Sequence, residues 1–317
     1  MKLGEIYREA VRLGIENDPR GTAEVDKVLE QTRKEYEEAK EEDREAFDQE
    51  RLVNPYSDTR ILYGGEEVEV RLLLAGIDVE VGELLLADRL RERGKPIDLV
   101  LSHHPEGKAL AALGEVMHLQ EDVLYQLGIP INVAEGILAN RIKEVHRSVM
   151  PLNHNRPVDA ARLLELPLMC VHTPADNLVT GYLSRLFVEK SPRTVGEVVK
   201  ILREIPEYRQ ALRVKAGPQI VVGADQRRAG KVFVDMTGGT SGSEEAYSRL
   251  AQAGVGTIVG MHMPDKHRQE AEKNHLNVVI AGHLASDSIG LNLFLDHLEE
   301  KGVSVLTCSG LIRVRRF

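Results

Sequence analysis

The sequence predicts an α/β fold of two lobes that face each other across a cleft, preceded by an N-terminal helical extension. Short apolar runs alternate with segments of helical period from about residue 71 onwards, which is the pattern of βαβ units. Three of these runs are followed directly by histidine and aspartate, although the runs lie far apart in the chain. Two lobes that meet at a cleft form the simplest architecture that joins motifs so widely separated.

The composition is that of a soluble globular protein, and 317 residues favour about two domains. A net charge of -9 argues against general nucleic-acid binding through counterion release. Aromatic residues make up only 4% of the chain and tryptophan is absent, which disfavours base-stacking surfaces. We therefore expect a small-molecule substrate and no general nucleic-acid binding.

The expected location is the cytoplasm. Cys170 and Cys308 both lie in apolar runs, where we expect them to be buried and reduced. The first residues do not form a signal peptide, and no apolar stretch approaches the roughly 18 residues that a membrane span requires. We expect no contact with a membrane.

Residues 1–55 form the predicted helical extension. Residues 3–16 have apolar side chains near helical spacing and end at Asn17-Asp18-Pro19. Residues 22–47 predict a longer, highly charged helix, which is either a solvated helix or a helix that binds a partner or the edge of an oligomer. A linker over residues 54–58 leads into the core.

Residues 56–317 form the predicted core. One lobe is expected to span approximately residues 56–180 with 277–317, and the other residues 181–276. Helices are expected over residues 82–93, much of 106–166, 178–186 and 195–204. Strands are expected over residues 71–78, 97–102, 168–170, 219–222, 232–235, 257–260, 278–281 and 303–306.

The first histidine motif is the adjacent pair His103 and His104, followed by Pro105. It ends the apolar run over residues 97–102, and open α/β sheets bind ligands at the carboxyl ends of their strands. Neutral imidazole is a common metal ligand. The pair therefore predicts a metal site at this edge of the sheet.

Two further motifs repeat this design. His283 and Asp287 follow the run over residues 278–281 and would point the same way if a helix begins near Leu284. His172 and Asp176 follow the run over residues 168–170 with the same spacing. Mixed imidazole and carboxylate ligands suit Zn, Fe, Mn, Co or Ni.

The sequence resembles the NGG-interacting-factor-three-like family, whose members are often labelled GTP cyclohydrolase type two homologues. The resemblance rests on Leu99-Val100-Leu101-Ser102-His103-His104-Pro105, on His172-Thr173-Pro174-Ala175-Asp176 and on Gly282-His283 with a carboxylate at 287. The glycine-rich segment 237–243 also looks like the turn that precedes a helix in the family's second half. The resemblance implies a two-lobed α/β fold, a dinuclear metal centre and a ring-shaped hexamer.

Carried over residue by residue, the family's ligands for two divalent transition-metal ions fall on His103, His104, Asp176, His283 and Asp287. The family usually has glutamate where this chain has Asp287, the carboxylate expected to bridge the two ions. Aspartate is one methylene shorter than glutamate. Either the helix that carries Asp287 lies closer to the metal ions than in the family, or the bridge between the ions is altered.

Other polar residues have more than one interpretation. His172 is either a catalytic acid-base group or a residue that orients Asp176. Asp78 either supports the site or caps a loop. His262 and His267 also follow a strand and could line the cleft, but they are expected to be ordinary loop residues outside the ligand set. The segment 237–243 is expected to form a tight turn rather than a phosphate site. The remaining histidines are expected to be surface or core residues: His118, His146, His154, His275 and His297.

The expected function is that of a dinuclear metal-dependent hydrolase acting on a small phosphorylated or nucleotide-like substrate, with His172 as the catalytic residue. The alternative is a non-catalytic metal-binding regulatory or scaffold protein. A GTP cyclohydrolase is the weakest alternative, because no residue identifies a guanine pocket.

Overall fold

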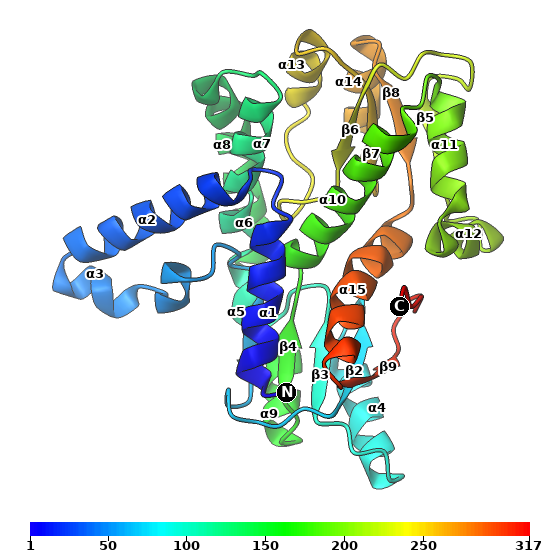
Figure 1. The fold of residues 1–317 in the computed structure, drawn as a ribbon. Helices are drawn as coiled ribbons and strands as arrows, with labels where there is room; N and C mark the ends of the chain where they lie inside the picture. Colours follow the sequence, from blue (N-terminus) through cyan, green and yellow to red (C-terminus); the bar gives the residue numbers. More distant parts are fainter.

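A computed structural model describes all residues 1–317 and confirms the α/β fold of two lobes (Figure 1). The first lobe holds a five-stranded sheet in the order β1 (Arg60–Tyr63), β4 (Leu168–Cys170), β3 (Leu99–Ser102), β2 (Leu72–Gly76) and β9 (Ser304–Thr307). The second holds a four-stranded sheet in the order β5 (Gln219–Val222), β8 (Asn277–Ile280), β7 (Val255–Gly260) and β6 (Lys231–Asp235).

Each sheet is parallel except for one edge strand. β1 runs antiparallel to β4, and β5 runs antiparallel to β8. Every residue of β3 is buried, as expected for an inner strand of a parallel sheet that is covered on both faces. The carboxyl ends of β3 and β4 therefore lie side by side at one edge of the first sheet.

Two long helices cross between the lobes (Figure 1). α10 (Thr173–Lys190) starts after β4 in the first sheet and reaches β6 in the second. α15 (His283–Glu300) starts after β8 in the second sheet and reaches β9 in the first. A side chain at Gly290 would clash with the carbonyl oxygen of Ala175, so this glycine lets the two helices pack closely. The close packing fixes their first turns relative to one another.

The first helix of the N-terminal segment packs against the first lobe. α1 (Leu3–Glu16) buries Leu3, Ile6 and Ala10 in the same core cluster as strands of the first sheet and α10 and α15. Lys2 also forms an isolated β-bridge with Glu69. The apolar face of α1 is therefore buried against the first sheet, α10 and α15, and the helix is part of this core.

The rest of the N-terminal segment projects from the body (Figure 1). The helix expected over residues 22–47 is two helices, α2 (Thr22–Glu38) and α3 (Glu41–Ala46), followed by the 3₁₀-helix η1 (Gln49–Leu52). The break occurs because Ala39 has extended backbone angles. α2 buries only Val25 and Leu29, so the early apolar residues anchor it and the later charged ones are solvated.

The remaining helices cover the two sheets. They are α4 (Val81–Glu92), α5 (Gly107–Ala111), α6 (Leu113–Val116), α7 (His118–Gln126), α8 (Ile131–Val149), α9 (Arg156–Leu163), α11 (Val195–Glu204), α12 (Pro206–Arg213), α13 (Ala246–Gln252) and α14 (Asp265–Lys273). None of the fifteen α-helices is both long and apolar enough to cross a lipid bilayer. Cys170 is buried, Cys308 is partly buried and neither forms a disulfide.

The chain moves between the lobes at other points than expected. β8 (Asn277–Ile280) pairs in the second sheet, whereas the sequence boundary placed residues 277–317 with the first lobe. Leu124 of α7 and Leu138 of α8 pack in one cluster with Ile258 and Val278 of the second sheet, although residues 56–180 were expected in the first lobe. β1 and α12 were not predicted.

Candidate metal centre

The adjacent histidines extend from the end of β3. The backbone N–H groups of His103 and His104 donate to the carbonyl oxygens of Gly76 and Ile77. Gly76 is the last residue of β2 and Ile77 follows it. The side chain of His103 is buried and that of His104 is 27% exposed. The strand end therefore holds one imidazole in the interior and directs the other toward solvent.

The other two motifs lie at helix starts. α15 begins at His283, so His283 and Asp287 are one turn apart on one face, as the spacing predicts. Gly282 before it has φ 111°, and a side chain there would clash with the carbonyl oxygen of Ala216. His172 precedes α10, and Asp176 lies in the first turn of that helix.

These residues meet between the lobes. The Nε2 atom of His103 lies 3.6 Å from Oδ1 of Asp176 and 3.6 Å from Oδ1 of Asp287. The Nε2 atoms of His104 and His283 lie 3.6 Å and 3.5 Å from Oδ2 of Asp287. The Nε2 atom of His172 lies 3.8 Å from Oδ2 of Asp176. These separations are too long for good hydrogen bonds.

Hydrogen bonds at Nδ1 of His103, His104 and His172 fix which ring nitrogen carries the proton. The Nδ1 atom of His103 lies 3.0 Å from the carbonyl oxygen of Val171, and that of His104 lies 2.6 Å from Oδ1 of Asp78. The Nδ1 atom of His172 lies 2.8 Å from Oδ2 of Asp58. Because these partners accept, each Nδ1 donates and each neutral ring keeps a lone pair on Nε2.

The centre therefore brings acceptor atoms together without a donor. The Nε2 atom of His103 and both carboxylate oxygens of Asp287 are buried and have no hydrogen-bond partner. Leaving such atoms unsatisfied is costly, and a cation among them would remove that cost. The ligand atoms fall into three groups within which all atoms lie within 4.8 Å of one another: His103, His104 and His172; His104, His283 and Asp287; His103, Asp176 and Asp287. These residues fit divalent metal ions.

The charges in the site are strongly coupled. Burial raises the pKa of Asp176 well above its usual value, and the nearby carboxylates of Asp287 and Asp58 raise it further. Burial also raises the pKa of Asp287, but the imidazoles of His103, His283 and His104 outweigh this and lower it. Burial lowers the pKa of His283, which favours the neutral imidazole that binds metals.

Asp58 is a site residue that the sequence analysis placed in a linker. It is completely buried, and its Oδ2 atom accepts hydrogen bonds from His172 and from the hydroxyl of Thr173. No local pattern identifies it, because 114 residues separate it from His172. Asp78, for which two interpretations were open, accepts the hydrogen bond from His104.

His262 and His267 also differ from the expectation that they are ordinary loop residues. Both line the cleft beside His172, Asp176 and His283. The ring centroids of His262 and His283 are 5.0 Å apart. His262 follows the buried strand β7, and His267 lies in the first turn of α14, so the strand end that the sequence shows is the signal for their place in the cleft.

Segment 237–243 forms the opposite wall of the cleft. Gly238 and Gly239 have positive φ angles, and their Cα atoms face Gln120 and Val116. The segment is thus a tight turn, but it packs on α6 and α7 rather than on a strand. The histidines expected to be surface or core residues take no part in the three metal-ligand groups.

The fold is similar to those of solved structures. Its TM-score to a NIF3 superfamily protein from Sphaerobacter thermophilus is 0.71, with 25% identity over 82% of this chain and 94% of that chain. Its TM-score to reduced HcgD from Methanocaldococcus jannaschii is 0.52, with 16% identity over 84% of this chain and 94% of that chain. No protein-family model and no curated protein matches the sequence. The similarity to the NIF3 superfamily protein confirms the resemblance that the histidine motifs predict.

Proposed function

We propose that this protein is a metal-dependent hydrolase that holds two divalent transition-metal ions, Zn, Fe or Mn. The proposed ligands are His103, His104, Asp176, His283 and Asp287. The observation that carries the proposal is the convergence of buried nitrogen and oxygen acceptors that lack any donor. The proposed substrate is a small phosphorylated or nucleotide-like molecule.

The histidines and aspartates have separate tasks. Asp78 and the carbonyl of Val171 orient His104 and His103, so that their Nε2 lone pairs face Asp287. Bound divalent ions would supply Lewis acidity and activate water at neutral pH. Asp58 holds the proton of His172 on Nδ1, which leaves Nε2 free to accept a proton from water or substrate.

Access to solvent favours catalysis over the alternative of a non-catalytic regulatory or scaffold protein. The side chains of His104 and His283 are 27% and 43% exposed, and His283 lines the cleft, whereas structural metal sites are usually closed by protein ligands. A substrate can approach from this side. The buried side, with His103 and Asp287, would hold the ions.

The first test is metal analysis of protein purified without chelators or a histidine tag. We expect about two transition-metal ions per chain, and a loss of at least one in the double variant His103→Ala/His283→Ala. His118→Ala is a matched control because His118 is a partly exposed histidine that pairs only with Glu121. Normal metal content in the double variant would refute the ligand assignment.

The second test is hydrolysis of bis(p-nitrophenyl) phosphate by the metal-loaded protein. Wild-type protein and His118→Ala should release p-nitrophenolate at the same rate, and the double variant should not. Full metal content without hydrolysis of this or a panel of other phosphoesters and cyclic substrates would favour the regulatory alternative.

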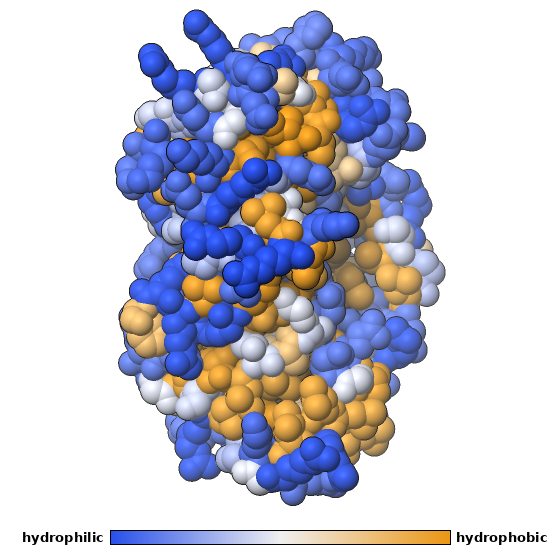
Figure 2. Space-filling model, turned by 90° about the vertical axis from the view of Figure 1, so that its right-hand side faces the viewer, coloured by the Kyte–Doolittle hydropathy of each residue, from blue (hydrophilic) through white to orange (hydrophobic).

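We further propose that the protein is cytoplasmic and forms a homo-oligomer, a hexamer by resemblance to its family. Apolar side chains gather over the lower part of the molecule in Figure 2, on the side that carries α4 and β9. Leu85 and Leu86 of α4 are 54% and 44% exposed, and β9 is an edge strand. Light scattering of the purified protein would measure the mass of the assembly.

A further inference from the structure

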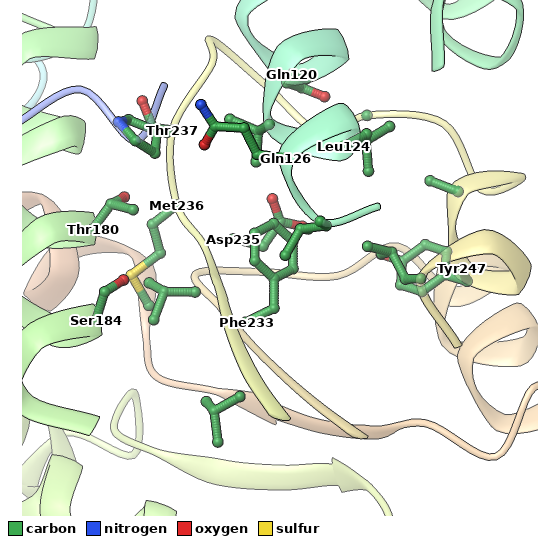
Figure 3. A pocket seen from close by; sticks show the side chains of 18 of the residues that line it. Gln120, Leu124, Gln126, Thr180, Ser184, Phe233, Asp235, Met236, Thr237 and Tyr247 are labelled. Carbon is green, nitrogen blue, oxygen red and sulfur yellow. The ribbon is translucent and has the colours of Figure 1, made fainter. Parts of the chain in front are cut away.

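A second cavity adjoins the candidate metal centre. It has a volume of about 380 Å³ and lies between α7, α10, β6 and α13 (Figure 3). This volume is within the range of small-molecule sites. Asp235, Tyr247 and His267 line both this cavity and the cleft that holds His172 and Asp287. A molecule in the cavity would therefore lie next to the metal centre.

The cavity wall is half apolar, since 11 of the 22 lining residues are hydrophobic. Phe233 and Tyr247 contribute aromatic rings, and Leu124 and Met236 contribute aliphatic and thioether surface. In Figure 3, Thr180 and Ser184 project from α10 on one side, Tyr247 lies on the opposite side and Asp235 lies between them. This wall suits a planar, largely apolar ring.

The wall offers an unpaired carboxylate and an unpaired hydroxyl to a ligand. The carboxylate of Asp235 forms no hydrogen bond or ion pair. The residue is exposed at the cavity wall, but the protein around it displaces enough water to raise its pKa to about 6. The hydroxyl oxygen of Thr180 is buried without a partner. The side-chain nitrogen atoms of Gln120 and Gln126 already donate to backbone carbonyls.

No cationic side chain of the wall neutralises Asp235. Lys231 is the one lysine or arginine that lines the cavity, and it lies four residues earlier on β6, about 13 Å along the strand. β6 is also an edge strand, so its outer backbone groups are not paired with another strand. An unpaired carboxylate beside an apolar wall favours a ligand with N–H donors.

We propose that this cavity binds a planar ring bearing N–H donors, which Asp235 recognises, as the non-reacting part of the substrate. The ring packs against Phe233 and Tyr247, and the reacting group extends past Tyr247 and His267 to the metal centre. The assignment of the ring to a substrate rests on the proposed hydrolase function. The binding of the ring is independent of the hydrolase function, because the residues that line the cavity are separate from the metal ligands.

The first test measures binding of two small probes to the metal-free, full-length protein by ligand-detected NMR. Benzamidine and benzoate have similar shapes, but benzamidine donates N–H groups and benzoate only accepts. We expect benzamidine to bind at least about tenfold more tightly than benzoate, because a hydrogen bond to a charged group contributes enough for this ratio. Absent or equal binding of the two probes would overturn the proposal.

Two variants test whether benzamidine binds in this cavity. Asp235→Asn should weaken its binding about tenfold, and Ser184→Phe should block it by filling the space beside α10. The matched controls are Asp225→Asn, an exposed aspartate outside the cavity, and Val188→Phe, one turn further along α10 where Val188 is 80% exposed. Binding that survives both cavity variants would overturn the proposal.

The second test uses Mn²⁺ to connect the cavity with the metal centre. Paramagnetic Mn²⁺ in the cleft should broaden the signals of bound benzamidine, and Mg²⁺ should not. Benzamidine that binds without broadening by bound Mn²⁺ would overturn its role as part of the substrate. If the protein binds no Mn²⁺ or other transition metal, the hydrolase proposal fails, while the first test still decides whether the cavity binds the ring.

Discussion

The Nδ1 atom of His172 lies 2.8 Å from Oδ2 of Asp58, a carboxylate with no exposure to solvent. Although burial raises the pKa of Asp58, hydrogen bonds from His172 and Thr173 outweigh it and lower the pKa below its usual value. Asp58 is therefore ionised at neutral pH. It accepts a hydrogen bond from Nδ1 of His172, and the proton stays on that nitrogen. The pair gives His172 a fixed orientation toward Asp176.

Replacing Asp58 tests whether His172 acts on the substrate. Asp58→Asn removes the charge that fixes the tautomer of His172, so hydrolysis of bis(p-nitrophenyl) phosphate should fall about 10- to 100-fold. Metal content should stay at two ions per chain, and Asp225→Asn should behave as wild type. A parallel loss of metal would instead mean that His172 orients the ligand Asp176.

Asp78 should matter for metal affinity rather than for folding. Its side chain is 61% exposed and accepts the hydrogen bond from Nδ1 of His104 at 2.6 Å. Asp78→Asn should weaken metal binding about tenfold, since outer partners of metal-binding histidines orient the ring. A competition titration with a zinc-binding dye measures the effect, with Asp88→Asn on α4 as control. Unchanged affinity would show that Asp78 only caps the loop.

Much of the candidate site could be predicted from local sequence. His283 and Asp287 meet because they are one helical turn apart. His103 and His104 meet them because these histidines follow β3 of the first sheet, while α15 follows β8 of the second, and the ends of both strands lie at the same site. Asp58 could not be found this way. It lies in an irregular segment between η1 and β1 and reaches His172 only through the tertiary fold.

The fold shows the same division between local and long-range information. The βαβ pattern predicts β2, β3 and the long helices, because apolar runs and helical period are local properties. It does not predict that α7 and α8 leave the first lobe to cover the second sheet. It also misses β1, a four-residue edge strand whose pairing with β4 depends on residues far along the chain.

The burial of α1 predicts that the N-terminus is required for stability. Ile6 has no exposure and packs with residues of β2, β3, α10 and α15. Ile6→Ala should lower the free energy of unfolding by roughly 2–5 kcal/mol, the range for truncated aliphatic core residues. Arg8→Ala, on the exposed side of α1, should change it by less than about 0.5 kcal/mol. Urea denaturation gives both values, and equal effects would contradict the core position of α1.

Asp176 should destabilise the metal-free protein. Its folded pKa is raised, so the folded state binds more protons than the unfolded state, and stability falls as pH rises above the usual aspartate pKa. Asp176→Asn replaces the titrating carboxyl group with a neutral amide, which adds N–H donors among the acceptors of His103 and Asp287. The substitution should raise the free energy of unfolding of chelator-treated protein at pH 7 by about 1 kcal/mol. It should also prevent the protein from binding two metal ions per chain. Thermal unfolding measures the first effect, and a lower melting temperature than wild type would contradict it.

Recognition by Asp235 should depend on pH. The protein around it displaces enough water to raise its pKa to about 6, so the carboxylate gains charge between about pH 5 and pH 7, and benzamidine should bind more tightly across that range. The other titratable groups of the wall are His267, Tyr247 and Lys231. Burial lowers the pKa of His267 and raises that of Tyr247, so neither is charged at pH 7. The increase should persist in His267→Gln and vanish in Asp235→Asn; an increase that follows His267 instead would mean that the imidazole controls entry of the cation.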